Sequence, residues 1–103
     1  MTVTAQTAVF RVAGEMTIYR AAELKQEILA QLDQHALLEF DLSEVSEIDS
    51  AGLQLLFLAA STAAARQGVA CIGPRSAAVR EVFAILGLDS RFPDPARTVS
   101  QHS

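Results

Sequence analysis

Residues 41–53 read DLSEVSEIDSAGL, and the rest of the chain is organised around this stretch. Its first two residues end the segment Leu37–Leu42. The nearly continuous apolar character of that segment predicts a strand covered by helices on at least one face. The polar segment Ser43–Asp49 predicts a loop. From Ser50 the sequence is rich in Leu and Ala, which are good helix formers, and it predicts a long helix that reaches about Gln67.

The flanking segments continue an alternation of strands and helices. Residues 8–13, AVFRVA, predict a strand that ends at Gly14, and residues 69–72, VACI, predict another. Residues 19–34 have apolar side chains at helical spacing and predict an amphipathic helix. Residues 76–86 predict a last helix that stops at Gly87. Strands that alternate with helices in this way predict an α/β domain with parallel neighbouring strands.

The composition is that of one folded domain. Of the 103 residues, 50% are hydrophobic and 19% are charged, which argues against a disordered chain and leaves no room for a second domain of ordinary size. The formal net charge is -4, from 8 basic and 12 acidic residues, and no cluster of Lys and Arg offers a site for a phosphate backbone. We therefore expect no nucleic-acid partner.

Membrane and metal functions are also disfavoured. The longest apolar run, residues 55–60, is far shorter than the ~18 residues needed to span a bilayer, so we expect no membrane insertion. The first residues begin no cationic signal peptide, which predicts a cytoplasmic protein. The single Cys71 has no disulfide partner and no Cys or His at metal-ligand spacing. The sequence therefore predicts no metal site and no cofactor.

Enzymatic functions find little support among the residues. A hydrolase triad needs a general base, but the two histidines are His35, at a predicted helix end, and His102, near the C-terminus. The carboxylates between Asp41 and Asp49 are expected to form a solvated acidic loop, because no Lys, His or phosphate-binding loop accompanies them. Arg75 and Arg80 are expected to be ordinary exposed arginines. These observations favour a protein that is not an enzyme.

The junction between the central strand and the long helix is the candidate site. A hydroxyl at a helix start commonly accepts a hydrogen bond from a first-turn N–H group, so Ser50 can be a plain N-cap. A phosphate on Ser50 would instead face the helix dipole and free N–H groups. Gly52 leaves the first turn unshielded by a side chain, and Asp49 could orient the hydroxyl. Both readings of Ser50 stay open from these residues alone.

The helix that follows this junction is apolar on more than one side. On a helical wheel, Leu55 and Leu58 project almost opposite the side expected to face the sheet. We expect flanking helices to bury Leu55. We expect Leu58 to be exposed and to form, with Gln54 and the Ser50 turn, an apolar patch for a partner. The residues expected to face the sheet are Leu53, Leu56, Phe57, Ala60 and Ala64.

Residues 45–53, VSEIDSAGL, follow the strand LEFDL and precede a Leu-rich helix. This arrangement resembles the signature of STAS domains, the anti-sigma-factor antagonist family, and the resemblance extends from Gly14 to Leu88. It implies one STAS-like domain over residues 1–103, with an ordered core at about 7–90 and a loose tail at 91–103. The implied fold is a small mixed β-sheet with helices mainly on one face. The short C-terminus, with Pro93 and Pro95, departs from fuller relatives, which have another strand and a helix there.

The resemblance also implies a function. In that family a dedicated kinase phosphorylates the serine that follows the Asp, and a phosphatase reverses the modification. That serine matches Ser50 here, whereas the next position, often Ser or Thr in the family, is Ala51. The implied function is a non-enzymatic protein-interaction module of a bacterial partner-switching pathway. Its implied partners are a serine kinase of the anti-sigma-factor type and a phosphatase.

Two sets of residues accompany Ser50 in this hypothesis. Asp49 and Gly52 are expected to support the phosphorylation site, and Leu53, Gln54 and Leu58 are expected to contact the partner. The alternative is a constitutive STAS subunit of a lipid-transport-type ATPase complex, in which the serine is only a helix N-cap.

Overall fold

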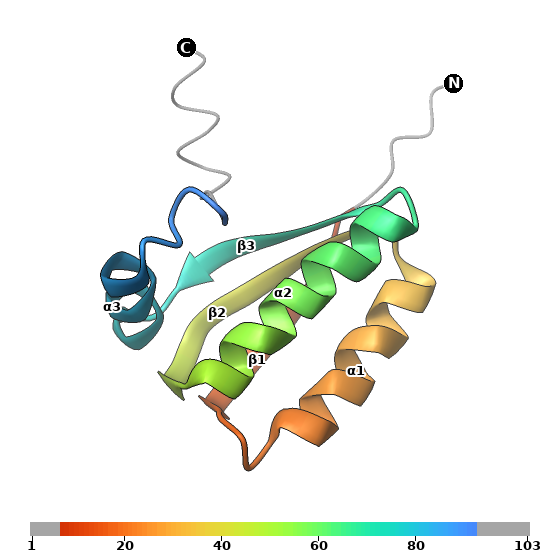
Figure 1. The fold of residues 1–103 in the computed structure, drawn as a ribbon. Coiled ribbons are helices and arrows are strands. Elements are labelled where there is room, and N and C mark those ends of the chain that lie inside the picture. Colours follow the sequence, from red (N-terminus) through yellow and green to blue (C-terminus); the bar gives the residue numbers. More distant parts are fainter. Residues whose placement is uncertain (1–6, 93–103) are drawn as a thin grey trace.

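The computed structural model describes residues 7–92. Along this part of the chain, strands and helices follow one another in strict alternation (Figure 1). The elements are β1 (Ala8–Met16), α1 (Ala21–Gln34), β2 (Leu37–Ile48), α2 (Ser50–Ala65), β3 (Val69–Arg75) and α3 (Ala77–Leu86). The sheet order is β1-β2-β3, and both neighbouring pairs are parallel. The α/β prediction is confirmed. The expectation of a mixed sheet is wrong for the described residues, because a crossover helix returns the chain to the same end of the sheet after each strand.

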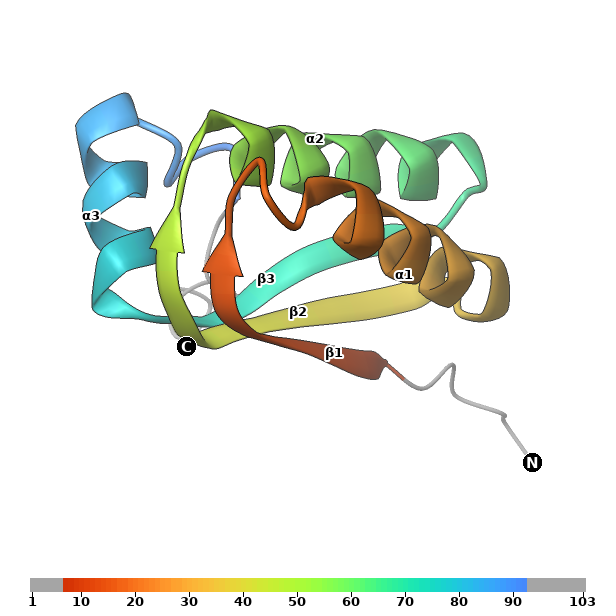
Figure 2. The same cartoon turned by 90° about the horizontal axis from the view of Figure 1, so that it is seen from below.

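The helices lie mainly on one face of the sheet, as expected. Figure 2 shows α1 and α2 side by side over that face, while α3 packs beside the carboxyl end of β2. The core between them contains the inward side chains of all six elements. Its largest fully buried side chains are Phe40, Phe83, Met16, Leu24, Ile28, Leu38, Leu42, Leu56 and Ile72.

The polar stretch Ser43–Asp49 is not the predicted loop, because β2 continues through it to Ile48. Val45 is buried in the core, whereas the serines and glutamates beside it face solvent. Two register shifts between β1 and β2 insert extra β2 residues, and such bulges bend strands. Gly14 has a φ of 85° at these shifts, a conformation that glycine adopts without strain, so β1 also runs past its predicted end to Met16. The bend carries the strand ends toward α2 (Figure 2).

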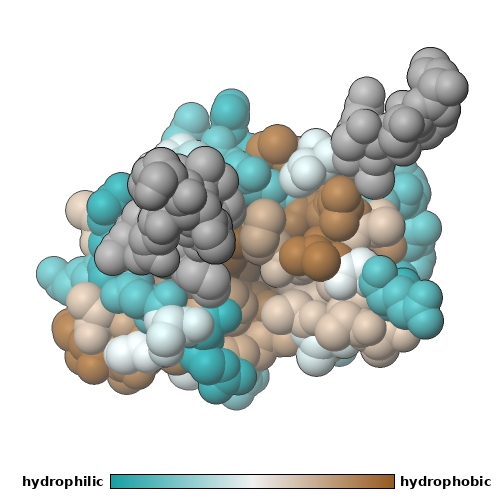
Figure 3. Space-filling view, turned by 90° about the horizontal axis from the view of Figure 1, so that it is seen from above, coloured by the Kyte–Doolittle hydropathy of each residue, from teal (hydrophilic) through white to brown (hydrophobic). Residues whose placement is uncertain are grey.

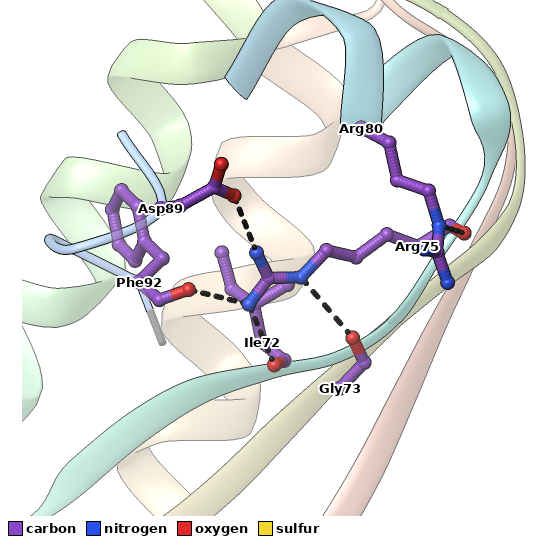
Figure 4. Close-up of polar contacts among 6 residues, drawn as sticks. All are labelled: Ile72, Gly73, Arg75, Arg80, Asp89 and Phe92. Carbon is purple, nitrogen blue, oxygen red and sulfur yellow. Dashed lines mark hydrogen bonds and ion pairs between the residues drawn. The ribbon is translucent and has the colours of Figure 1, made fainter. Parts of the chain in front are cut away.

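Arg75 is a buried structural residue and not the ordinary exposed arginine that the sequence suggested. Its side chain is 7% exposed. The guanidinium donates to the carbonyl oxygens of Ile72 (3.3 Å), Gly73 (3.4 Å) and Phe92, and it lies 3.5 Å from the Asp89 carboxylate (Figure 4). These contacts tie the segment after α3 to the end of β3.

Phe92 is buried at the end of that segment. Its ring centroid lies 5.1 Å from that of Phe57 on α2 and 5.7 Å from that of Phe83 on α3. The loose tail expected from residue 91 is therefore wrong at Phe92, which is 5% exposed. Residues 93–103 of that expected tail lie outside the described residues.

Candidate functional site

Asp49 joins two elements at the start of α2. Its Oδ1 accepts a hydrogen bond from the Gly52 N–H (3.1 Å), and its Oδ2 accepts one from the Ile18 N–H (3.0 Å). The Asp49 N–H donates to the Met16 carbonyl oxygen (3.2 Å). The carboxylate thus caps α2 and also holds the turn between β1 and α1. The reading of Ser50 as the N-cap is wrong, because Asp49 occupies that position.

The same hydrogen bonds favour the charged form of Asp49. The Ile18 amide is the main cause of a lowered pKa for this carboxyl, and the Gly52 and Ala51 amides add to it, while partial burial opposes them. Asp49 is therefore ionised at neutral pH. A negative charge at a helix start is also stabilised by the helix dipole.

The lowered pKa of Asp49 predicts a dependence of stability on pH. A carboxyl whose pKa is lower in the folded state stabilises the fold above its ordinary pKa, and that contribution disappears as the pH falls through the lowered value. Asp49→Asn should therefore reduce the loss of thermal stability that occurs below about pH 4. Circular dichroism melting curves between neutral and acid pH measure this.

Asp41 supplies the comparison for that experiment. Its pKa is also lowered, mainly by the Ser43 hydroxyl and amide, with a smaller contribution from Arg11 at 3.2 Å. Asp41→Asn should also reduce the loss of thermal stability at acid pH, and the double variant should reduce that loss further. An acid limb for Asp49→Asn that is as steep as that of the unmodified sequence would contradict the assignment.

Ser50 is the first residue of α2 and is exposed. Within residues 7–92, no group is hydrogen-bonded to its hydroxyl, so the oxygen is accessible to a modifying enzyme. One first-turn amide, however, is not free as the sequence suggested, because the Asp49 carboxylate accepts a hydrogen bond from the Gly52 N–H. A phosphate on Ser50 would stand beside a carboxylate that already uses this donor.

Gly52 allows the close approach of α2 to β1. A Cβ atom at this position would lie 2.2 Å from the Met16 carbonyl oxygen and 2.9 Å from Ile48 Cγ1. Gly52 itself is buried. The expectation that Gly52 leaves the first turn unshielded by a side chain stays a prediction, and the structure adds that the glycine allows α2 to pack closely against β1.

The structure divides the three predicted interface residues. Leu53 is 8% exposed and belongs to the core, which agrees with its expected position on the sheet-facing side of the helix and leaves little of its side chain for a partner. Gln54 is exposed and Leu58 is half-buried. Leu55 is buried, as predicted. Ala59 and Ala63 are buried where Ala60 and Ala64 were expected, because α2 is rotated toward α1 relative to the predicted face.

Gln54 and Leu58 line a groove between α2 and the beginning of α1. The groove has a volume of about 420 Å³, and Ala51 extends its lining to the residue next to Ser50. From the α1 side come Ile18 and Lys25. This lining is mostly apolar, with one cationic side chain.

Ile18 and Tyr19 are the surface residues that the sequence analysis missed. Their exposed fractions are 68% and 89%, and Asp49 holds the backbone of Ile18. The signal was present, since two large apolar side chains stand together just before a helix whose core residues begin only at Leu24. The sequence predicts a helix from about residue 19, whereas α1 begins at Ala21.

Comparisons with known proteins agree with this fold. The family model described as "Mlab, STAS domain" matches residues 2–94. The chain belongs to the STAS domain family, that of the anti-sigma-factor antagonists. A comparison with curated proteins gave no match.

Solved STAS structures have the same fold. An anti-sigma factor antagonist from Mycobacterium paratuberculosis is 30% identical, with a TM-score of 0.70 over 86% of this chain and 77% of that one. The antagonist SpoIIAA in its unphosphorylated form is 24% identical, with a TM-score of 0.69 over 98% of this chain and 91% of the other. Bacillus SpoIIAA in its phosphorylated form is 22% identical, with a TM-score of 0.63 over 100% of this chain and 96% of that one.

A sulfate transporter family protein from Wolinella succinogenes also shares the fold, at 12% identity and a TM-score of 0.67 over 98% of this chain and 88% of that one. In residues 7–92 of the present STAS domain, none of the helices has the length and apolar character required to cross a membrane. The same part of the chain contains no group of three His, Cys, Asp or Glu side chains placed to hold a metal ion.

Proposed function

We propose that this STAS domain is a non-enzymatic protein-interaction module of a bacterial partner-switching pathway, controlled by reversible phosphorylation of Ser50. The observation that carries the proposal is the Ser50 hydroxyl, which is exposed and unpartnered within residues 7–92 at a helix start fixed by Asp49. The solved structures of SpoIIAA in its phosphorylated and unphosphorylated forms support it. The proposed partners are a serine kinase of the anti-sigma-factor type and a phosphatase, in the cytoplasm.

The proposed switch is electrostatic. A kinase would transfer the γ-phosphoryl group of ATP to the Ser50 oxygen, releasing ADP and removing the hydroxyl proton to a base. The phosphate adds about -1.5 to -2 charges at neutral pH. It would stand beside ionised Asp49, three positions after the exposed Glu47. A partner that docks on the unmodified Ser50 turn and the apolar groove would lose affinity, without any refolding of the domain.

The direct test uses the serine kinase encoded nearest to this chain. Incubation with ATP, followed by phosphopeptide mapping, should place the phosphate on Ser50. The unmodified and phosphorylated proteins should then differ in their affinity for that kinase, measured by calorimetry. Phosphate on another residue, or equal affinity of both forms, would contradict the proposal.

Leu58 tests the groove as the docking surface. Leu58→Ala should weaken partner binding by about 1–2 kcal/mol, because a half-buried leucine at an interface loses apolar contacts on truncation. Thermal stability should change little compared with a core truncation. Leu86→Ala is the matched control, since Leu86 is 55% exposed on α3 and does not line the groove. A large stability loss for Leu58→Ala would show that it acts as a core residue.

Ser50→Asp should copy the phosphorylated state only in part. One carboxylate supplies less charge and fewer acceptor oxygens than a phosphate, although it stands beside Asp49 in the same way. Partner affinity should fall between those of the unmodified and phosphorylated proteins. The differences should narrow as salt rises, because screening weakens exposed charge interactions. Titration of the three forms at two ionic strengths measures this, and three equal affinities would favour a constitutive subunit.

The second candidate function is that of a constitutive STAS subunit in a lipid-transport-type ATPase complex. The match to the family described as "Mlab, STAS domain" and the fold shared with a sulfate transporter family protein favour it. In that case the chain should copurify with an ATPase whether Ser50 or Ala occupies position 50. A kinase-dependent change in binding would argue against it.

A further inference from the structure

Lys25 is the only lysine of the chain, and it lines the groove between α2 and the beginning of α1. A lysine on a helix commonly pairs with a carboxylate three or four positions away. Those four positions are occupied here by apolar residues, which are Ala21, Ala22, Ile28 and Leu29. Lys25 also forms none of the ion pairs found within residues 7–92. In the described part of the chain, its ammonium group is therefore a cation without an anionic partner.

The other cationic side chains within residues 7–92 are all engaged. Four of them form ion pairs with Asp or Glu, namely Arg11, Arg20, Arg66 and Arg75. Arg80 donates to the Arg75 carbonyl oxygen (3.2 Å), and the guanidinium of Arg91 lies 5.0 Å from the centroid of the Phe57 ring. Lys25 is thus the exception in this part of the chain, and it lies in the groove that begins next to Ser50.

The groove is also the apolar surface that the described chain leaves open. Another apolar area lies over β3 and the adjoining part of α2 (Figure 3). On that side of α2, Phe92 packs against Phe57 with ring centroids 5.1 Å apart, so the segment after α3 already covers part of it. The groove is lined by small side chains such as Ala21 and Ala51, and Ile18 beside it is 68% exposed. It therefore has room for side chains of a partner.

We propose that the groove binds an apolar segment of the serine kinase that also presents a carboxylate to Lys25. This inference rests on the proposed function and adds the chemistry of the docking segment. The apolar lining favours apolar side chains, and a single cation among them favours a single carboxylate, since the ion pair is partly desolvated once the groove is filled. A broadly acidic segment is disfavoured, because the chain itself has a net charge of -4.

The sign of the proposed switch favours a carboxylate over a cation in the docking segment. Ala51, the residue after Ser50, lines the same groove as Lys25. A phosphate on Ser50 would attract a basic segment, and the phosphorylated domain would then bind the kinase more tightly. The phosphate would instead repel a carboxylate and compete with it for Lys25. Only the second effect agrees with a partner that leaves the phosphorylated domain.

Calorimetry of the full chain with the serine kinase encoded nearest to it tests the role of Lys25. Lys25→Gln should weaken binding about tenfold or more, because it leaves the docked carboxylate unpaired. Gln26→Glu is the matched control, since it changes the net charge by the same amount and Gln26 is exposed on α1 without lining the groove. The control should change the affinity by no more than about twofold. Equal weakening by both variants would reduce the effect to net charge and overturn the proposal.

Zero-length cross-linking identifies the group that meets Lys25. A water-soluble carbodiimide activates a carboxyl group, which then forms an amide bond with an amine in contact, while the carbodiimide takes up the lost water as a urea. Because Lys25 is the only lysine, mass spectrometry of the product should show a kinase Asp or Glu joined to it. Lys25→Arg should bind with similar affinity and give no such product. A complex without this cross-link, or a product that joins Lys25 to a second copy of this chain, would overturn the proposal.

The same measurements separate this inference from the proposed function. Phosphorylation of Ser50 together with undiminished affinity of Lys25→Gln would overturn the docking chemistry and leave the proposed function standing. A kinase that neither binds the chain nor labels Ser50 would overturn both.

Discussion

Ser50→Ala is expected to abolish labelling by the cognate serine kinase and to leave the domain folded. The substitution removes the acceptor oxygen of the proposed phosphorylation. It removes no helix cap, because the Asp49 carboxylate caps α2 through the Gly52 amide. Alanine is also the best helix former, and position 50 is exposed. The free energy of unfolding should therefore stay within about 0.5 kcal/mol of that of the unmodified protein.

Incubation with the kinase and radioactive ATP measures the loss of labelling. Urea unfolding measures the free energy of unfolding. Ser46→Ala is the matched control, because Ser46 is an exposed serine four residues earlier on β2. It should be labelled as strongly as the unmodified chain. Full labelling of Ser50→Ala would refute the site, whereas a stability loss near 1 kcal/mol would mean that the hydroxyl contributes to the cap after all.

The division of roles between Asp49 and Ser50 shows what the sequence could and could not predict. Either side chain can cap a helix, so the residue types alone leave the cap undecided. The decision depends on the Ile18 amide, 31 positions earlier, which fixes one oxygen of Asp49 while the other caps α2. The periodicity of apolar residues, which predicts helices and strands, does not predict such a long-range hydrogen bond.

The prediction of a loop at Ser43–Asp49 failed for a similar reason. Ser43–Asp49 is polar enough for a loop, and one buried residue, Val45, is too weak a strand signal. β2 continues there because Ala13–Met16 supplies parallel partners, and that pairing requires the unusual conformation of Gly14. By contrast, the helices and the order of elements follow from local periodicity and were predicted closely.

Long polar side chains were the hardest to predict. Arg75 is surrounded in sequence by Pro and Ser, which suggests a surface turn, and its burial results from Phe92, Asp89 and the Phe83 ring at 5.1 Å. Leu53 was assigned both to the sheet-facing side of the helix and to the partner surface, and its burial agrees with the first assignment. Both outcomes are set by packing between elements distant in sequence.

Gly52→Ala should cause the larger structural effect of the two substitutions at this site. An alanine inside a helix normally gains about 1 kcal/mol over glycine. Here the new Cβ would lie 2.2 Å from the Met16 carbonyl oxygen, a backbone atom that cannot rotate away. The start of α2 must move off β1, and overpacking of this kind costs about 3 kcal/mol. We expect a net loss of about 2 kcal/mol in the free energy of unfolding, measured by urea denaturation.

The displaced helix start should also impair the proposed site. The Asp49 N–H donates to the same Met16 oxygen, so movement there disturbs the carboxylate that places Ser50. Kinase labelling of Gly52→Ala should fall with the fold still present at low temperature. Gly87→Ala separates this effect from simple strain, because Gly87 has a φ of 66° and nothing within 4 Å of the added Cβ. That control should lose about 1 kcal/mol and keep full labelling. Normal labelling of Gly52→Ala would mean that the close approach of α2 to β1 does not determine the geometry of Ser50.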